Sequence, residues 1–86
     1  MNHRILVVDD EPGIRAALRQ LLEYEGYTVA VATGGEEALE AYAADRPHLV
    51  LLDVKMAGLD GLTVLGRLRE LDPAAIVVMI SGHGTI

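Results

Sequence analysis

Four polar side chains in this sequence of 86 residues directly follow apolar runs. Asp9 and Asp10 follow the letters ILVV, Asp53 follows LVLL, and Ser81 follows IVVMI. Clustered carboxylates repel one another strongly at low dielectric unless a cation lies among them. Hard oxygen ligands without a nearby Cys or His favour Mg²⁺, which usually binds one or two carboxylates and keeps several waters. A fold that brought these acids together would therefore form a candidate Mg²⁺ site.

The same residues could carry out phosphoryl transfer. With Mg²⁺ bound, the Asp53 carboxylate could attack a phosphorus atom and form an aspartyl phosphate. The metal would neutralise charge on the transferring group, and the Ser81 hydroxyl could donate a hydrogen bond to a phosphoryl oxygen. Positioning and electrostatics of this kind are most of what phosphoryl transfer requires.

The apolar runs predict four short strands: Ile5–Val8, Thr28–Ala32, Leu49–Leu52 and Ile76–Ile80. Three of these runs are apolar at every position, which is typical of strands buried on both faces of a sheet. The run Thr28–Ala32 has smaller side chains and is predicted to be an edge strand.

Helical periods lie between the predicted strands. Pro12 suits the first turn of one helix, Gly26 suits its end, and Asp60 is expected to cap another helix. We expect three apolar stripes to face the core. They are Ile14, Ala17, Leu18, Leu21 and Leu22; then Ala38, Leu39, Tyr42 and Ala43; then Leu62, Leu65, Leu68 and Leu71.

The alternation of strands and helices predicts an α/β fold with a doubly wound parallel sheet. The expected strand order is 2-1-3-4, the first four strands of the flavodoxin-like order. The chain reverses direction between the first and third strands, and ligands bind in the crevice at the carboxyl ends of strands beside such a switch point. Asp9, Asp10, Asp53 and Ser81 are therefore expected to converge on one crevice.

The bulk composition limits the classes of partner. The formal net charge is −6, which disfavours direct binding to nucleic acid or to anionic membranes. The sequence has no Cys, and no apolar run approaches the roughly 20 residues that span a bilayer. The N-terminus lacks the apolar segment of a signal peptide, so a cytoplasmic location is expected.

Three motifs in order resemble the receiver domains of bacterial two-component response regulators. ILVVDDEPGIR is similar to the family's first strand and acidic pair, LVLLDVKMAGLDG to its phosphoacceptor strand and following loop, and VVMISGHGTI to its fourth strand and switch hydroxyl. The SGHGT stretch is also similar to receivers that head σ54-dependent transcriptional activators. The resemblance implies a flavodoxin-like receiver fold that receives phosphate from a histidine kinase or a small phosphodonor.

The resemblance also implies a role for individual residues. Asp53 matches the phosphoacceptor, and Asp9 and Asp10 match the metal-binding acids that hold Mg²⁺ together with Asp53. The main-chain carbonyl of Lys55 matches the third protein ligand, and Ser81 matches the conserved hydroxyl. One departure is Ala57, which stands where the family usually has Pro and should loosen the turn slightly.

The resemblance covers residues 1–86 as one receiver domain that is incomplete at its C-terminus. The family's fifth strand, its Lys and its last two helices would lie beyond Ile86, which places signalling by this segment in question. The open fourth strand would then favour self-association through the uncovered sheet edge and faces.

Two further functions stay open beside the phosphoacceptor, which is not expected to be an enzyme. A Mg²⁺-dependent phosphohydrolase would also use an aspartyl nucleophile, but such enzymes typically carry Asp-x-Asp after their first strand. An interaction module that no longer uses the pocket is the other alternative. Transcription regulation is the expected context of the phosphoacceptor.

Overall fold

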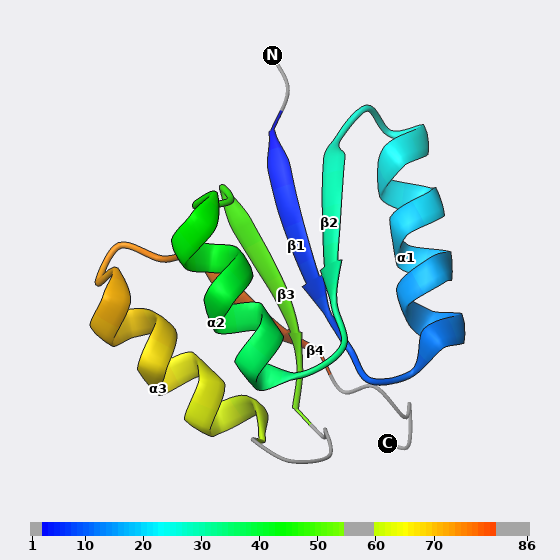
Figure 1. The fold of residues 1–86 in the computed structure, drawn as a ribbon. Helices are drawn as coiled ribbons and strands as arrows, with labels where there is room; N and C mark the ends of the chain where they lie inside the picture. Colours follow the sequence, from blue (N-terminus) through cyan, green and yellow to red (C-terminus); the bar gives the residue numbers. More distant parts are fainter. Residues whose placement is uncertain (1–2, 55–59, 81–86) are drawn as a thin grey trace.

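The computed structural model describes residues 3–54 and 60–80. These residues form a four-stranded parallel sheet with the strand order β2-β1-β3-β4, which confirms the predicted class and order. The helix α1 lies on one face of the sheet, and α2 and α3 lie together on the other (Figure 1). In chain order the elements are β1 (Arg4–Val8), α1 (Pro12–Tyr24), β2 (Thr28–Ala32), α2 (Gly35–Ala44), β3 (Leu49–Asp53), α3 (Gly61–Leu71) and β4 (Val77–Ile80).

The strand bounds differ from the predicted runs by one residue in three places. β1 begins at Arg4, β3 extends to Asp53, and β4 begins at Val77. Ile76 lies outside β4 and is 61% exposed, although its carbonyl still accepts a hydrogen bond from the Val50 N–H at 3.0 Å. The extension of β3 matters most, because it makes Asp53 part of the sheet.

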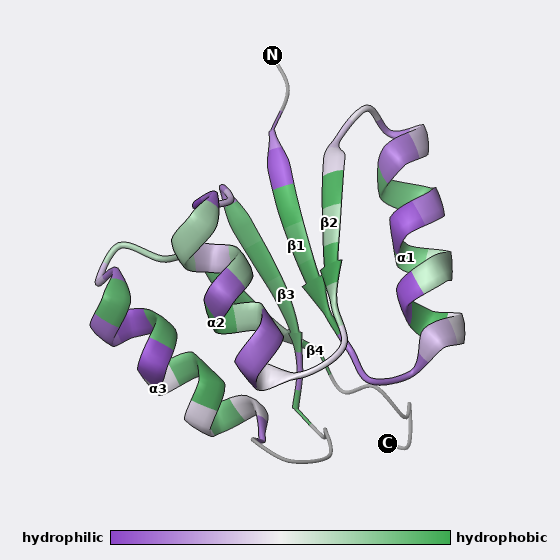
Figure 2. Cartoon of the chain, viewed as in Figure 1, coloured by the Kyte–Doolittle hydropathy of each residue, from purple (hydrophilic) through white to green (hydrophobic). Residues whose placement is uncertain are grey.

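Side chains that alternate along the strands form two apolar layers. The larger layer packs β1 and β3 against α2 and α3 and contains Leu6, Leu52 and Leu68, each at most 1% exposed. The smaller layer packs the opposite faces of β1 and β2 against α1. Figure 2 shows the strands as largely hydrophobic and the helices as mixed, which is the pattern expected of a sheet covered by amphipathic helices.

The predicted stripe of α3 was correct for Leu65 and Leu68 but wrong for Leu62 and Leu71. The buried residues of this helix are Gly61, Val64 and Leu68, with Leu65 partly buried. Leu62 is 67% exposed and Leu71 is 43% exposed. Each residue rotates the side chain by about 100° around a helix. Leu62 is two positions before the buried Val64, so it lies on nearly the opposite side of α3 and faces outward.

The other two stripes are buried less fully than predicted. Ala38 and Tyr42 of α2 are buried and Leu39 packs against them, but Ala43 is exposed. No residue of α1 is fully buried. Leu18 and Leu22 are partly buried and pack against the sheet. Ile14 is also half-buried, whereas Ala17 and Leu21 are exposed. The stripe of α1 is less buried because the smaller apolar layer contacts this helix mainly through Leu18 and Leu22.

Apolar side chains also remain exposed beside β4. This strand ends the described sheet on the side opposite β2, and Val78 is 44% exposed. The self-association expected through this edge stays a prediction.

The buried side chain of Tyr42 links α2 to the segment after α3. Its hydroxyl donates a hydrogen bond to Asp72 Oδ2 at 2.8 Å, and Arg46 Nη1 lies 3.3 Å from the same oxygen. The Tyr42 hydroxyl and then the Ala74 N–H hold the pKa of Asp72 below its ordinary value. The contact therefore stabilises the fold when Asp72 is ionised.

We expect Tyr42→Phe to lower the free energy of unfolding at pH 7 by about 1 kcal/mol, the usual net contribution of one hydrogen bond. Because the pKa of Asp72 is lowered in the folded state, this contribution is complete above the unfolded value of 3.8 and is lost as the pH falls below it. Urea unfolding from pH 7 to pH 3 should show the variant and the wild type converging. Tyr24→Phe, which changes a side chain that is 86% exposed, is the control.

Candidate functional site

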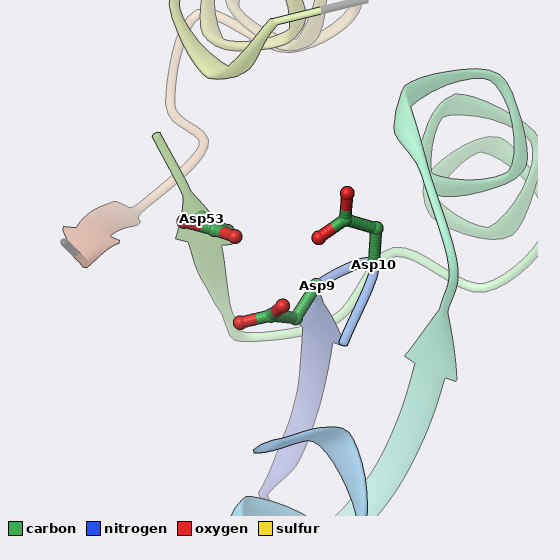
Figure 3. Close-up of side chains that lie close together, drawn as sticks. All are labelled: Asp9, Asp10 and Asp53. Atoms are coloured by element: carbon green, nitrogen blue, oxygen red, sulfur yellow. The ribbon is translucent and has the colours of Figure 1, made fainter. Parts of the chain in front are cut away.

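Three carboxylates meet at the carboxyl ends of β1 and β3. One oxygen from each of Asp9, Asp10 and Asp53 can be chosen so that all three lie within 4.8 Å of one another. Asp9 and Asp53 are fully buried, whereas Asp10 is exposed. Figure 3 shows the three side chains around a common space, Asp53 from β3 and the other two from the end of β1. The expected convergence of these acids is therefore present in the fold.

Strand register explains why residues so distant in sequence meet. β1 and β3 are adjacent and parallel, and Val8 pairs with Leu52. Asp9 and Asp53 each follow one residue later, so they are neighbours at the same edge of the sheet. The Asp9 N–H donates to the Ala32 carbonyl at 3.2 Å, which holds the end of β1 against the end of β2.

The environment of Asp9 opposes its ionisation. Burial is the largest effect and raises the pKa of the Asp9 carboxyl, and the nearby Asp53 carboxylate also raises it. The Glu11 N–H, which donates to Asp9 Oδ1 at 2.9 Å, lowers this pKa. The other oxygen, Oδ2, is buried and accepts no hydrogen bond from the described residues. A buried carboxylate next to two others is costly without a cation, and oxygen ligands of this kind suit Mg²⁺. The residues present therefore fit a divalent cation.

Two of the predicted site residues, Lys55 and Ser81, lie outside the described residues. The described residues resume at Asp60, which caps α3 as predicted. Its Oδ1 accepts a hydrogen bond from the Thr63 N–H at 2.8 Å. This hydrogen bond holds the pKa of Asp60 below its ordinary value.

Two residues around the site were not predicted from the sequence. Arg15 Nη1 donates a hydrogen bond to the Asp9 carbonyl oxygen at 2.8 Å. The buried Gly61 donates its N–H to the Val54 carbonyl at 3.1 Å and packs against the main chain of Asp53. Both residues belong to motifs that were singled out, but an arginine on a helix and a glycine beside an N-cap usually have local roles.

Sequence comparison identifies the class of protein. The family model for the response regulator receiver domain matches residues 5–86, so the chain belongs to this family. It is 40% identical over 86 residues to sporulation initiation phosphotransferase F of Bacillus subtilis, covering all of this chain and 69% of that protein. It is 47% identical over 88 residues to the nitrogen assimilation regulatory protein NtrX of Azorhizobium caulinodans, covering all of this chain and 19% of the relative.

Solved structures agree with this assignment. The response regulator TrrA of Thermotoga maritima, in complex with Mg²⁺ and BeF, superposes with a TM-score of 0.90 at 41% identity, over 95% of this chain and 71% of that one. TrrA in complex with the histidine kinase ThkA gives a TM-score of 0.89 at 41% identity, over 96% of this chain and 72% of that one. The protein is thus a receiver domain of a two-component response regulator, which is a signalling domain.

The extent of the matches differs among relatives. The chain spans about two thirds of the sporulation phosphotransferase but only about a fifth of NtrX.

Within the described part of the chain, no helix has the length and apolar character needed to cross a membrane.

Proposed function

We propose that Asp53 is the phosphoacceptor of this receiver domain and that Asp9, Asp10 and Asp53 hold Mg²⁺ beside it. The observation that supports this most is the placement of three carboxylates within 4.8 Å, two of them fully buried, at the switch point of the sheet. The Lys55 carbonyl as a further ligand and the Ser81 hydroxyl as a phosphoryl donor are part of the same proposal. The cytoplasmic location and the σ54 context stay predictions.

In the proposed step, a carboxylate oxygen of Asp53 attacks the phosphorus of the donor. An O–P bond forms as the bond from phosphorus to the donor breaks, and the bonding electrons leave with the donor group. Bound Mg²⁺ supplies neutralisation of negative charge on the transferring group. Asp53 is the last residue of β3, which holds its carboxylate at the edge of the sheet, and the exposed Asp10 lies on the solvent side of the site.

The proposed donor is a histidine kinase or a small acyl phosphate. The complex of TrrA with ThkA supports the first, because TrrA matches 96% of this chain. The complex of TrrA with Mg²⁺ and BeF supports the metal. We propose that the domain transfers a signal and has no separate substrate to turn over.

Incubation with acetyl phosphate and Mg²⁺ tests this proposal. We expect the intact mass to increase by one phosphoryl group, peptide mapping to place it on Asp53, and chelation of Mg²⁺ to prevent it. Asp53→Asn should remove the modification completely, and Asp10→Asn should slow it through loss of metal affinity. Glu40→Gln, which neutralises an exposed acid on α2, is the control and should react at the wild-type rate.

Modification that persists in Asp53→Asn would refute the assignment of the phosphoacceptor. Turnover of phosphate esters by the wild type would favour the phosphohydrolase. If the protein is not phosphorylated and does not bind Mg²⁺, the interaction module would be favoured.

A further inference from the structure

Asp9 is held by three hydrogen bonds, two through its main chain and one through its side chain. Its N–H donates to the Ala32 carbonyl of β2 at 3.2 Å, and its side-chain Oδ1 accepts from the Glu11 N–H at 2.9 Å. Its carbonyl oxygen accepts from Arg15 Nη1 at 2.8 Å. The first two contacts are local to the strand end and the turn, whereas the third comes from a side chain six residues away on α1.

The Arg15 contact acts on the peptide plane between Asp9 and Asp10. A peptide unit is planar, so holding the Asp9 carbonyl oxygen also limits the direction in which Asp10 leaves the strand. Asp10 is exposed and lies two positions beyond Val8, the last residue of β1, so the sheet alone does not determine where its carboxylate points. The Arg15 hydrogen bond is a contact that can keep this carboxylate directed at Asp53.

The position of Arg15 is itself well determined. Arg15 is half-buried, and its main-chain N–H donates to the Glu11 carbonyl at 3.0 Å in the first turn of α1. Arg15 also interacts electrostatically with Glu37 of α2. The pKa of Glu37 is below its ordinary value mainly because the Thr33 N–H and hydroxyl donate to it, and partly because of the Arg15 charge. Arg15 therefore has a hydrogen-bond partner directly after β1 and an electrostatic partner on α2.

We infer that Arg15 is a positioning residue of the carboxylate site, which acts through the Asp9 carbonyl to hold Asp10 in place for Mg²⁺. This inference rests on the proposed metal site and adds a residue to it. Arg15 contacts neither the metal nor the phosphoryl group in this role. It is a supporting contact of the kind whose loss typically weakens metal binding by about 10-fold to 100-fold.

The charge of Arg15 and its hydrogen bond make opposite contributions to Mg²⁺ affinity. Removing a positive charge near three carboxylates should strengthen the binding of a cation by Coulomb attraction alone. Removing a hydrogen bond that positions Asp10 should weaken it. The direction of the change in affinity therefore separates positioning from electrostatics, and a purely structural role would lower stability without changing affinity.

The test is a Mg²⁺ titration of the chain followed by the amide signals of Asp10 and Asp53. We expect Arg15→Ala to raise the dissociation constant about tenfold. Arg15→Lys, which keeps the charge and can donate one hydrogen bond, should recover part of that loss. Arg19→Ala removes the same charge from an exposed position on α1 that pairs with Glu23, and it should leave the affinity unchanged or slightly higher.

A second measurement requires no metal. Hydrogen exchange of the Glu11 amide, which donates to Asp9 Oδ1, should become faster in Arg15→Ala and stay unchanged in Arg19→Ala. Unchanged or tighter Mg²⁺ binding by Arg15→Ala would overturn the inference, as would unchanged exchange. A wild type that binds no Mg²⁺ would instead refute the proposed function, and the exchange measurement would still decide whether Arg15 holds the turn.

Discussion

Gly61→Ala should destabilise the protein by about 2–3 kcal/mol, near the upper end of the usual cost of overpacking. A Cβ at this position would lie 2.5 Å from the Asp53 carbonyl oxygen and 2.8 Å from the Val54 Cα. Both are main-chain atoms at the end of a central strand, so no side chain can rotate away. The start of α3 would have to move from the sheet, against a total stability of only about 5–15 kcal/mol.

A matched variant on the same helix separates this clash from the general effect of alanine. At Gly66 an added Cβ would meet no atom within 4 Å. Gly66→Ala should therefore stabilise the protein by about 0.5–1 kcal/mol, because alanine favours helix more than glycine does. Urea unfolding followed by circular dichroism would compare the two variants. Equal stability of Gly61→Ala and the wild type would contradict the expected clash.

Asp9→Asn should increase the stability of the metal-free protein and weaken its response to Mg²⁺. The Asp9 carboxylate is buried next to Asp53, and these conditions raise its pKa, so its charge destabilises the fold at neutral pH. An asparagine can still accept the Glu11 N–H through its carbonyl oxygen. Mg²⁺ stabilises by mass action, about 2.7 kcal/mol at 100 times its dissociation constant, and a tenfold weaker site would give about half of that.

Thermal unfolding with and without Mg²⁺ measures both effects. The wild type should show the lower midpoint in the chelated sample and the larger increase on adding metal. Glu40→Gln should behave like the wild type in both conditions. A metal-free Asp9→Asn that unfolds at a lower temperature than the wild type would show that the carboxylate does not destabilise the fold.

Most of the strands could be predicted from hydropathy. Strands buried on both faces are continuous apolar runs, and Leu49–Leu52 was recognised for this reason. The carboxylate cluster followed, because parallel strands bring their carboxyl ends to one edge and Asp9 and Asp53 stand at two such ends. No side-chain geometry was needed for either step.

The missed features depend on geometry that hydropathy does not report. Gly61 has no side chain, yet it approaches β3 so closely that an added Cβ would clash with the main chain of Asp53 and Val54. The stripe on α1 was regular, but it could not show that the smaller apolar layer leaves Leu21 exposed. The Arg15 contact depends on how the loop after β1 returns, which spacing along a helix does not determine.

The register of β1 and β3 has a consequence for folding. Because side chains alternate between the faces of a strand, a slip of one residue would turn Asp9 or Asp53 to the opposite face. Only the alignment that pairs Val8 with Leu52 places both acids at one edge. If the proposed site binds Mg²⁺, its affinity would report correct strand alignment, and the metal would favour the aligned sheet over slipped ones during refolding.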